Sequence, residues 1–455
     1  MRLIYKYNPL IAVCLLFFCH GLAQDSTFKS GFHHPAWAAQ SNVYEVNLRQ
    51  YSNAGTFKAF EKHLPRLRNM GVEILWFMPI TPIGIEGRKM TSTDLGSYYS
   101  VRNYKAVSKE FGTMNDWKAL VKHAHSLGFK VIIDWVPNHS SADNPWIKDH
   151  PDFYVKDSLG NIMPPNPDWT DTRQLNYQNE QMRDSMLAAL KFWITQTGID
   201  GYRCDQANLV PMAFWKNAIV QLKKIKNVLM IAEAEDKGIY EAGFDAMYTW
   251  TVFHSMKDLY KGTKPLAEFI KIVDDNYKNF GDNGYRLYFT TNHDENSWNG
   301  TEYELFGDAV ECFNVFLFTM KQSVPLIYSG QEVPNKKRLK FFVRDPIQWN
   351  KYEMASFYKT LLKLRRKTPA LAADAFYKKL VTCNDAAIFA YTREKQGHKI
   401  SVVLNLSNEP QRFTIKEKAI YGEPMNVFLS MKEKLHREHV YSIEPWGYIV
   451  YNYDK

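Results

Sequence analysis

The sequence predicts an α/β protein: a (β/α)8 TIM barrel with an insertion after the third strand, followed by a C-terminal antiparallel β-sandwich domain. Three observations predict this fold. Eight apolar, β-rich segments alternate with helix-like stretches, and only strand-like segments follow Ala370. The chain of 455 residues, 45% hydrophobic and 15% aromatic, can also fill a core of that size. The expected boundaries are 24–139 and 180–370 for the barrel, 140–179 for the insertion and 371–455 for the sandwich.

The expected barrel strands are near-continuous runs of apolar and β-branched residues, which are typical of a parallel sheet buried on both faces. They are "VYEVNL" from Val43, "VEILWFMP" from Val72, "KVIIDWVPNH" from Lys130, "GIDGYRCD" from Gly198, "VLMIAEA" from Val228, "DAMYTW" from Asp245, "RLYFTTNHD" from Arg286 and "VPLIYSGQE" from Val324. Between them, apolar residues at helical spacing indicate helices that pack one face on the sheet. Two such faces are formed by Phe57, Phe60, Leu64 and Leu67, and by Met182, Met186, Ala189, Leu190, Trp193 and Ile194.

Two regions depart from a bare barrel. The segment 140–179 is rich in Asn, Asp, Pro and Trp and has no clear periodicity, so it is expected to be a loop-like insertion beside the strand ends. The C-terminal region contains "AIFAYTRE", "KISVVLNLSN", "QRFTIK", "MNVFLS" and "WGYIVYNY", separated by turn residues. Short strands with such spacing predict a small β-sandwich.

The N-terminus has the pattern of a secretory signal peptide over residues 1–23. Arg2 and Lys6 precede an apolar run, and Gly21 and Ala23 fit a cleavage site that needs small residues. The alternatives are a membrane anchor, for which the run is too short, and a lipoprotein modified at Cys19, for which the preceding residues are too bulky. We therefore expect an exported protein, periplasmic or secreted, with no membrane span.

Neither the cysteines nor the charge indicates a further partner. The three cysteines outside the signal are scattered and make no disulfide framework. The formal net charge is +9, but the basic residues are spread along the chain, and the one dense run, "NKKRLK" from Asn335, is interpreted as a solvated loop. No nucleic-acid partner is expected.

Polar, ionisable side chains follow four of the expected strands. A single polar strand end is usually a structural cap, but the C-terminal ends of barrel strands meet at one rim, where barrel enzymes carry their active sites. Four such ends together therefore predict a shared site. Its candidate residues are Asp134, Asn138 and His139 after the third strand, Arg203 and Asp205 in the fourth, Glu233 after the fifth, and His293 and Asp294 after the seventh.

The residue types favour glycoside hydrolysis over metal-assisted hydrolysis. The histidines and acids could ligate zinc. However, no His-x-x-x-His pair accompanies them, and Arg203, two positions before Asp205, would repel a cation. A fixed arginine instead lowers the pKa of a neighbouring carboxylate. An ionised acid beside a protonated one is the arrangement that glycoside hydrolysis needs.

Four motifs carry a family resemblance. "DWVPNH" from Asp134, "GYRCD" from Gly201, "IAEA" from Ile231 and "TTNHDEN" from Thr290 resemble, in the right order, four sequence regions of the α-amylase family, glycoside hydrolase family 13. The resemblance implies the nucleophile at Asp205, the general acid/base at Glu233 and a third carboxylate, which stabilises the transition state, at Asp294.

The resemblance also implies roles around these three acids. Arg203 would orient and ionise Asp205, while His139 and His293 would bind the sugar at the cleaved bond. In "SYYSVRNYKAVSKEFGT", Tyr99 would stack on the sugar ring; the alternatives are that Tyr99 is a core residue or that Tyr98 is the better match.

Calcium is the candidate cofactor. Its oxygen ligands could come from Asn138 together with Asp168 or Asp171 of the insertion, and the alternative is that Asn138 only hydrogen-bonds backbone. Many α-amylases carry a Lys-His pair after the nucleophile, which helps to bind glucan and supplies a calcium ligand. Asn208 and Leu209 stand there in this chain.

The expected function is that of an exported retaining α-glycosidase hydrolysing α-1,4-linked glucans or maltodextrins through a glycosyl-enzyme intermediate. The expected partner is an α-glucan or maltooligosaccharide. Alternatives with the same motifs are a transglycosylase, an α-1,6-glucosidase and a trehalose synthase-type isomerase. A non-catalytic glucan-binding relative is an alternative of a different class.

Overall fold

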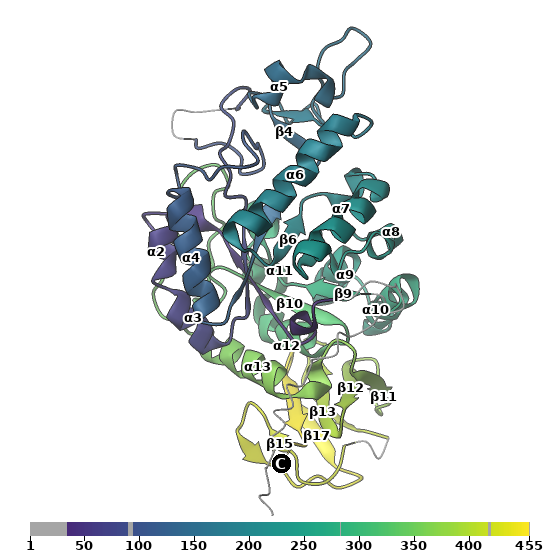
Figure 1. Cartoon of the computed structure of the whole chain (residues 1–455). Helices are drawn as coiled ribbons and strands as arrows, with labels where there is room; N and C mark the ends of the chain where they lie inside the picture. The colour runs from purple at the N-terminus through teal and green to yellow at the C-terminus, as the bar shows by residue number, and fades with distance from the viewer. Residues whose placement is uncertain (1–33, 90–93, 283, 417–419, 455) are drawn as a thin grey trace, which may run out of the picture.

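The computed structural model describes residues 34–89, 94–282, 284–416 and 420–454, so the predicted signal peptide lies outside the described residues. Eight parallel strands close into a barrel in the order β1-β10-β9-β8-β7-β6-β3-β2 (Figure 1). Their bounds are β1 Val43–Val46, β2 Ile74–Phe77, β3 Lys130–Trp135, β6 Gly201–Cys204, β7 Leu229–Ala232, β8 Ala246–Tyr248, β9 Tyr285–Tyr288 and β10 Ser323–Tyr328. Each lies within or against one of the eight predicted segments, and the predicted barrel is confirmed.

Helices surround the barrel, as Figure 1 shows. The α-helices are α1 Leu48–Tyr51, α2 Phe57–Glu61, α3 Leu64–Met70, α4 Met114–Ser126, α5 Trp146–Asp149, α6 Glu180–Thr197, α7 Met212–Ile225, α8 Lys237–Glu241, α9 Trp250–Tyr260, α10 Leu266–Phe280, α11 Glu302–Phe306, α12 Val310–Thr319 and α13 Ala355–Lys367. Both predicted apolar faces are buried. The face from Phe57 to Leu67 is divided between α2 and α3, because the chain turns at His63 ahead of Pro65.

The insertion after β3 is more ordered than its composition predicts. It contains a two-stranded antiparallel sheet of β4 (His139–Ser141) and β5 (Thr172–Gln174), in which His139 pairs with Gln174. The loop after β2 packs on this insertion at Gly87. The φ of Gly87 is +77°, a Cβ there would lie 2.2 Å from the Thr170 carbonyl oxygen, and the Thr170 hydroxyl donates a hydrogen bond of 2.6 Å to the Gly87 carbonyl.

The C-terminal region forms the antiparallel domain that the sequence predicts. A six-stranded sheet with the order β11-β12-β13-β18-β15-β16 faces a two-stranded sheet, β14-β17, across a shared apolar core. The strands are β11 Phe376–Leu380, β12 Ile388–Lys395, β13 His398–Asn405, β14 Gln411–Thr414, β15 Met425–Asn426, β16 Met431–Lys432, β17 Val440–Ile443 and β18 Tyr448–Asn452.

Sequence reasoning misjudged four strands of this domain. The predicted strand "MNVFLS" contains only the two residues of β15, because the Asn426 side-chain oxygen accepts a hydrogen bond from the Leu429 amide and turns the chain. Strands β11, β16 and β17 were not predicted. Strands β11 and β17 alternate more exposed with less exposed residues and so lack a continuous apolar run, and β16 has only two residues, both exposed. Within the described part of the chain, no helix is both long and apolar enough to cross a membrane.

Candidate active site

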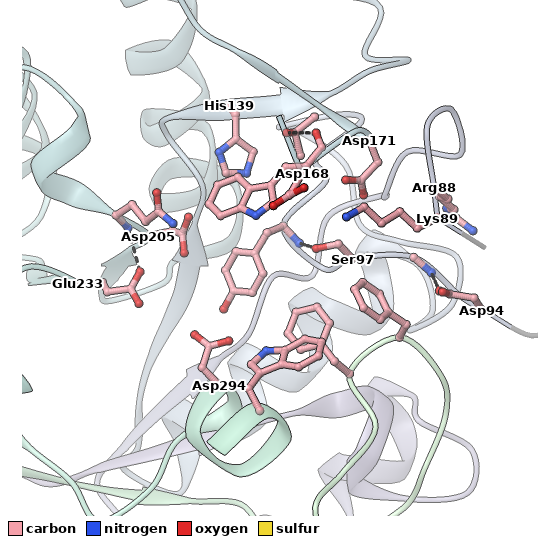
Figure 2. A pocket seen from close by; sticks show the side chains of 18 residues that line it. Arg88, Lys89, Asp94, Ser97, His139, Asp168, Asp171, Asp205, Glu233 and Asp294 are labelled. Atoms are coloured by element: carbon pink, nitrogen blue, oxygen red, sulfur yellow. Dashed lines mark hydrogen bonds between the residues drawn. The ribbon is translucent and has the colours of Figure 1, made fainter. Parts of the chain in front are cut away.

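A cleft of about 540 Å³ opens at the C-terminal ends of the barrel strands (Figure 2). Asp205, Glu233 and Asp294 reach it from the ends of β6, β7 and β9, and His139 reaches it from β4. The loop after β2 and the insertion form the rest of one wall. The cleft is lined by Arg88, Lys89, Asp94, Gly96, Ser97, Tyr99, His139, Asp168, Trp169, Asp171, Thr172, Asp205, Gln206, Glu233, Asp294, Trp298, Phe341 and Phe342.

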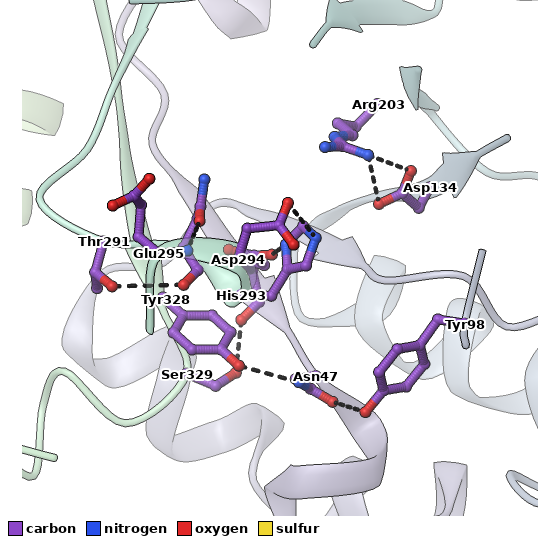
Figure 3. Close-up of polar contacts among 12 residues, drawn as sticks. Asn47, Tyr98, Asp134, Arg203, Thr291, His293, Asp294, Glu295, Tyr328 and Ser329 are labelled. Carbon is purple, nitrogen blue, oxygen red and sulfur yellow. Dashed lines mark hydrogen bonds and ion pairs between the residues drawn. The ribbon is translucent and has the colours of Figure 1, made fainter. Parts of the chain in front are cut away.

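Arg203 joins three carboxylates beneath this cleft. Its Nη1 lies 2.9 Å from Asp134 Oδ1 and 3.1 Å from Asp205 Oδ1, and its Nη2 lies 3.0 Å from Glu233 Oε2. The guanidinium is fully buried and packs 5.1 Å from the ring centre of Trp76. Asp134 is buried behind it, and Figure 3 shows the contact to both of its oxygens. Burial raises the pKa of Asp134 to about 6, although Arg203 opposes the shift.

The pKa of Asp205 differs from the expectation that Arg203 lowers it and ionises Asp205. Burial and the nearby negative charge of Glu233 raise the pKa of Asp205 well above its usual range, and the Arg203 guanidinium only partly opposes them. Two carboxylates that share one cation titrate as a coupled pair, because the charge of one disfavours ionisation of the other.

Gln206 fixes the second member of this pair. Its backbone N–H donates to Glu233 Oε2 at 2.9 Å, and its φ is 39°, a left-handed conformation that is uncommon for a residue other than glycine. Backbone strain of this kind is concentrated at functional sites. The strained backbone of Gln206 therefore donates the hydrogen bond that orients the Glu233 carboxylate.

His293 connects Asp294 to the interior of the barrel. Its Nδ1 lies 2.5 Å from Glu45 Oε1, and its Nε2 lies 3.3 Å from Asp294 Oδ2. Burial opposes the charged imidazolium, but these two carboxylates raise the pKa of His293 well above its usual value. In turn, the positive charge of His293 outweighs burial and lowers the pKa of Asp294, so that Asp294 is a carboxylate facing the cleft.

Tyr99 faces the cleft and Tyr98 does not. The Tyr99 hydroxyl lies 2.7 Å from His293 Nε2 and donates to Asp134 Oδ2 at 3.1 Å. Tyr98 is buried, and its hydroxyl donates to Asn47 Oδ1 at 2.9 Å (Figure 3). The structure thus shows which of the two tyrosines faces the cleft, a choice that the sequence left open. His139 also lines the cleft, and burial lowers its pKa to about 4, so its imidazole is neutral.

The residues near Asn138 do not fit a calcium cage. The side-chain nitrogen of Asn138 lies 3.4 Å from His139 Nδ1, and its backbone carbonyl oxygen accepts a hydrogen bond from the Leu175 backbone amide. Figure 2 places Asp168 and Asp171 on the wall of the cleft, and the charges of Arg88 and Lys89 act on the Asp171 carboxylate. No group of three or more His, Cys, Asp or Glu suited to a metal occurs among the described residues. The Asn138 side chain thus contacts a histidine ring, whereas the alternative role given to it was hydrogen bonding to backbone alone. Calcium binding by Asn138 stays a prediction.

Several residues of the cleft escaped the sequence analysis. Trp298 lies four positions after Asp294, in a short π-helix over Glu295–Asn299, and Phe341 and Phe342 directly follow the basic run that was interpreted as a solvated loop. Trp169, whose ring centre is 5.5 Å from that of His139, lies in the insertion. The sequence signal that could have revealed these residues was the presence of aromatic side chains in segments without helical or strand periodicity. Aromatic residues in such segments indicate a binding surface more than a buried core.

Comparison with known proteins decides the family. The family model of the alpha-amylase catalytic domain matches residues 39–375. The chain belongs to the α-amylase family. Members of this family are glycoside hydrolases that act on O-glycosyl bonds, and the protein is one of them. The family match spans the barrel strands, the insertion and every candidate residue named above.

Relatives within the α-amylase family cover most of the chain. Alpha-amylase 2 of Dictyoglomus thermophilum is 25% identical over 430 residues, which include 84% of this chain and 72% of that protein. The crystal structure of an alpha-amylase from Lactobacillus plantarum has a TM-score of 0.82 and 28% identity, covering 92% of this chain and 99% of the other. That of a noncanonic maltogenic alpha-amylase from Thermotoga neapolitana has a TM-score of 0.81 and 28% identity, covering 91% and 98%.

Proposed function

We propose that the protein is an exported retaining α-glycosidase that hydrolyses α-1,4-linked glucans or maltodextrins. The observation that carries the proposal is the shared contact of Asp205 and Glu233 with one guanidinium, at 3.1 Å and 3.0 Å from the two terminal nitrogens of Arg203. This contact holds the two carboxyls close together. Retaining glycosidases use a pair separated by about 5–5.5 Å, whereas inverting enzymes leave room for a water between them.

In the first step, Asp205 attacks the anomeric carbon while Glu233 protonates the departing glycosidic oxygen. The bond from carbon to that oxygen breaks, and an ester between the sugar and Asp205 forms. The pair needs one proton and one negative charge for this step. The raised pKa of Asp205 supports that state, because it favours retention of one proton by the pair. Once a glycosidic oxygen faces Glu233, Glu233 donates its proton to that oxygen, and Asp205 carries the negative charge.

In the second step, Glu233 removes a proton from a water molecule, which attacks the anomeric carbon. The bond between that carbon and the Asp205 oxygen breaks, and Asp205 leaves as a carboxylate. Two inversions return the α configuration to the product. Asp294 is an ionised carboxylate that reaches the same cleft from the end of β9, and it accepts hydrogen bonds from sugar hydroxyls that strengthen as the ring flattens. The neutral His139 and the charged His293 bind the same sugar, and Tyr99 stacks on it.

A product assay tests this function. Maltoheptaose is incubated with the protein, and NMR follows the anomeric proton of the first products. We expect α-anomers to appear first and then mutarotate, whereas initial β-anomers would contradict the double displacement. Pullulan and trehalose form the rest of the panel. Products from pullulan alone would indicate an α-1,6-glucosidase, and formation of trehalose from maltose would indicate an isomerase.

Export is tested separately. The signal pattern over residues 1–23 supports it. We expect the mature protein from a secreting host to begin at Gln24 and to occur outside the cytoplasm. N-terminal sequencing and cell fractionation measure both, and an uncleaved N-terminus in the cytoplasmic fraction would contradict this part of the proposal.

A further inference from the structure

A buried carboxylate lies behind the histidine that neighbours Asp294. Glu45 belongs to β1, is fully buried and is not among the residues that line the cleft. Its Oε1 lies 2.5 Å from His293 Nδ1, and among the described residues no group hydrogen-bonds to its Oε2. A buried carboxylate is costly unless a cation or hydrogen bonds compensate for the lost water. The charge of Glu45 therefore depends on His293.

The hydrogen bonds of Tyr99 fix the protonation of the other nitrogen of His293. The Tyr99 hydroxyl has one proton, and it donates this proton to Asp134 Oδ2 at 3.1 Å. Asp134, paired with Arg203, is a carboxylate above its pKa of about 6 and only accepts. The contact of 2.7 Å between the Tyr99 oxygen and His293 Nε2 then requires the nitrogen to donate. His293 thus carries a proton on Nε2.

A second proton lies in the short contact between His293 Nδ1 and Glu45. Two observations place it on the nitrogen rather than on the carboxyl group. Asp294 Oδ2 lies 3.3 Å from Nε2, as Figure 3 shows, so another negative charge stabilises the imidazolium. The two carboxylates raise the pKa of His293, and its positive charge is the main group that opposes the effect of burial on the pKa of Glu45. Each member of this pair keeps the other charged.

The other ionisable groups around the pair do not replace Glu45. Arg203 already contacts three carboxylates, and Asp134 is one of them. Burial raises the pKa values of Tyr248 and Tyr328 well above their usual range, so both are neutral. The ionisable groups that face the pair are Tyr99 after β2, Asp134 on β3, Arg203 on β6, Tyr248 on β8, Asp294 after β9 and Tyr328 on β10.

On the basis of the proposed function, we propose that Glu45 is a positioning residue: its buried charge keeps both nitrogens of His293 protonated, and this cation holds Tyr99 and Asp294 in place for the sugar. Loss of the charge would leave His293 neutral. With its one proton on Nδ1, the ring would then turn a lone pair toward the Tyr99 oxygen and the Asp294 carboxylate. Both contacts become repulsive, so the two groups that meet the sugar lose their fixed positions.

Glu45→Gln tests the charge, because it keeps the shape and its amide oxygen can still accept from Nδ1. The readout is the ratio of variant to wild-type kcat/KM on maltoheptaose, measured between about pH 5.5 and about pH 8. We expect this ratio to fall by about tenfold or more over the range. His293 of the variant loses its proton as the pH rises, whereas that of the wild type retains it, and misplaced catalytic groups cost up to about 100-fold.

Two further variants separate charge from shape and from burial. Glu45→Asp keeps the negative charge on a shorter side chain, so its ratio should stay nearly constant with pH even if both rates are lower. Glu332→Gln is the matched control, because Glu332 is also fully buried in the barrel but contacts Arg66 at 3.0 Å and Tyr44 at 2.7 Å. Its ratio should not depend on pH.

NMR of the wild-type protein measures the protonation of His293 directly, and it applies even if Glu45→Gln does not fold. The nitrogen-15 shifts of His293, assigned by comparison with His293→Gln, distinguish protonated from unprotonated ring nitrogens. We expect both nitrogens to be protonated at about pH 8. An unprotonated nitrogen there, or a ratio for Glu45→Gln that does not vary with pH, would overturn the role of Glu45 while the proposed hydrolysis stands. A wild-type protein that leaves maltoheptaose intact would overturn the proposed function itself.

Discussion

Arg203 and Asp134 form a fully buried ion pair, in which Arg203 Nη1 lies 2.9 Å and 3.2 Å from the two carboxylate oxygens of Asp134. Their strands are neighbours, and the two residues are register partners between β3 and β6. The barrel itself therefore fixes the arginine. A buried pair adds little net stability when it is compared with apolar residues, but removal of one partner leaves an uncompensated charge.

We expect Arg203→Gln to lower the free energy of unfolding by about 3–5 kcal/mol, because Asp134 then stays buried without its cation. The same variant should move the acid limb of the kcat/KM profile to higher pH, since the Arg203 charge is the main group that opposes the raised pKa of Asp205. Thermal unfolding and a pH series of initial rates measure these effects. Arg102→Gln is the control, as the half-exposed Arg102 pairs with Asp143 at 3.4 Å and should contribute about 1 kcal/mol or less. An equal loss in both variants would contradict the prediction.

Asp294→Asn should separate transition-state binding from ground-state binding. The amide keeps the shape of the side chain and removes the charge that His293 stabilises, so we expect turnover to fall by roughly 1,000-fold with a modest change in affinity for maltotetraose. Asp205→Asn and Glu233→Gln should nearly abolish turnover. Initial rates and calorimetric titration give the two quantities. Near-normal turnover of Asp294→Asn would refute its assignment.

Glu302 should make stability depend on pH. It is buried beneath the end of β9, where the Thr290 hydroxyl and the Gln331 amide donate to its Oε2, and burial raises its pKa to about 7. Because the folded pKa exceeds the ordinary value of 4.5, its stabilisation is complete below pH 4.5 and is lost as the pH rises through 7.

Glu302→Gln tests this dependence, because it keeps the shape and cannot ionise. The stability of the variant relative to the wild type should therefore increase by about 2–3 kcal/mol between pH 4.5 and pH 8. Urea unfolding at both values is the measurement. A difference that does not vary with pH would show that Glu302 is ionised in the folded protein.

Excess chelator should leave the melting temperature unchanged. A calcium ion bound only to the folded state would stabilise the protein by mass action. However, Asn138 bonds His139 and Leu175, and the acidic residues of the insertion lie on the cleft wall. Differential scanning calorimetry with and without EDTA decides the matter. A fall of several degrees that added calcium reverses would establish a calcium site and contradict our interpretation of Asn138.

The barrel and the residues at its strand ends could be predicted from sequence, because both depend on local pattern. Continuous apolar strands ending in Asp205, Glu233 or Asp294 are visible without any tertiary contact. The contact between Trp298 and Phe341 could not be predicted, since the two rings meet only when two irregular segments fold over the same cleft. The direction of the pKa shift at Asp205 was missed for a similar reason. It depends on how deeply the carboxylate is buried and how close Glu233 lies, and neither quantity follows from spacing along the chain.

The contact between Gly87 and Thr170 has a consequence for engineering this enzyme. Residues 83 positions apart meet here through a hydrogen bond from the Thr170 hydroxyl to the Gly87 carbonyl, in a fit that leaves no room for a side chain at Gly87. The loop after β2 and the insertion after β3 are therefore complementary halves of a single transplantable unit. A chimaera that takes only one of these two segments from another family member loses the fit between Gly87 and Thr170 beside the substrate cleft. Exchange of both segments together keeps a matched contact between them.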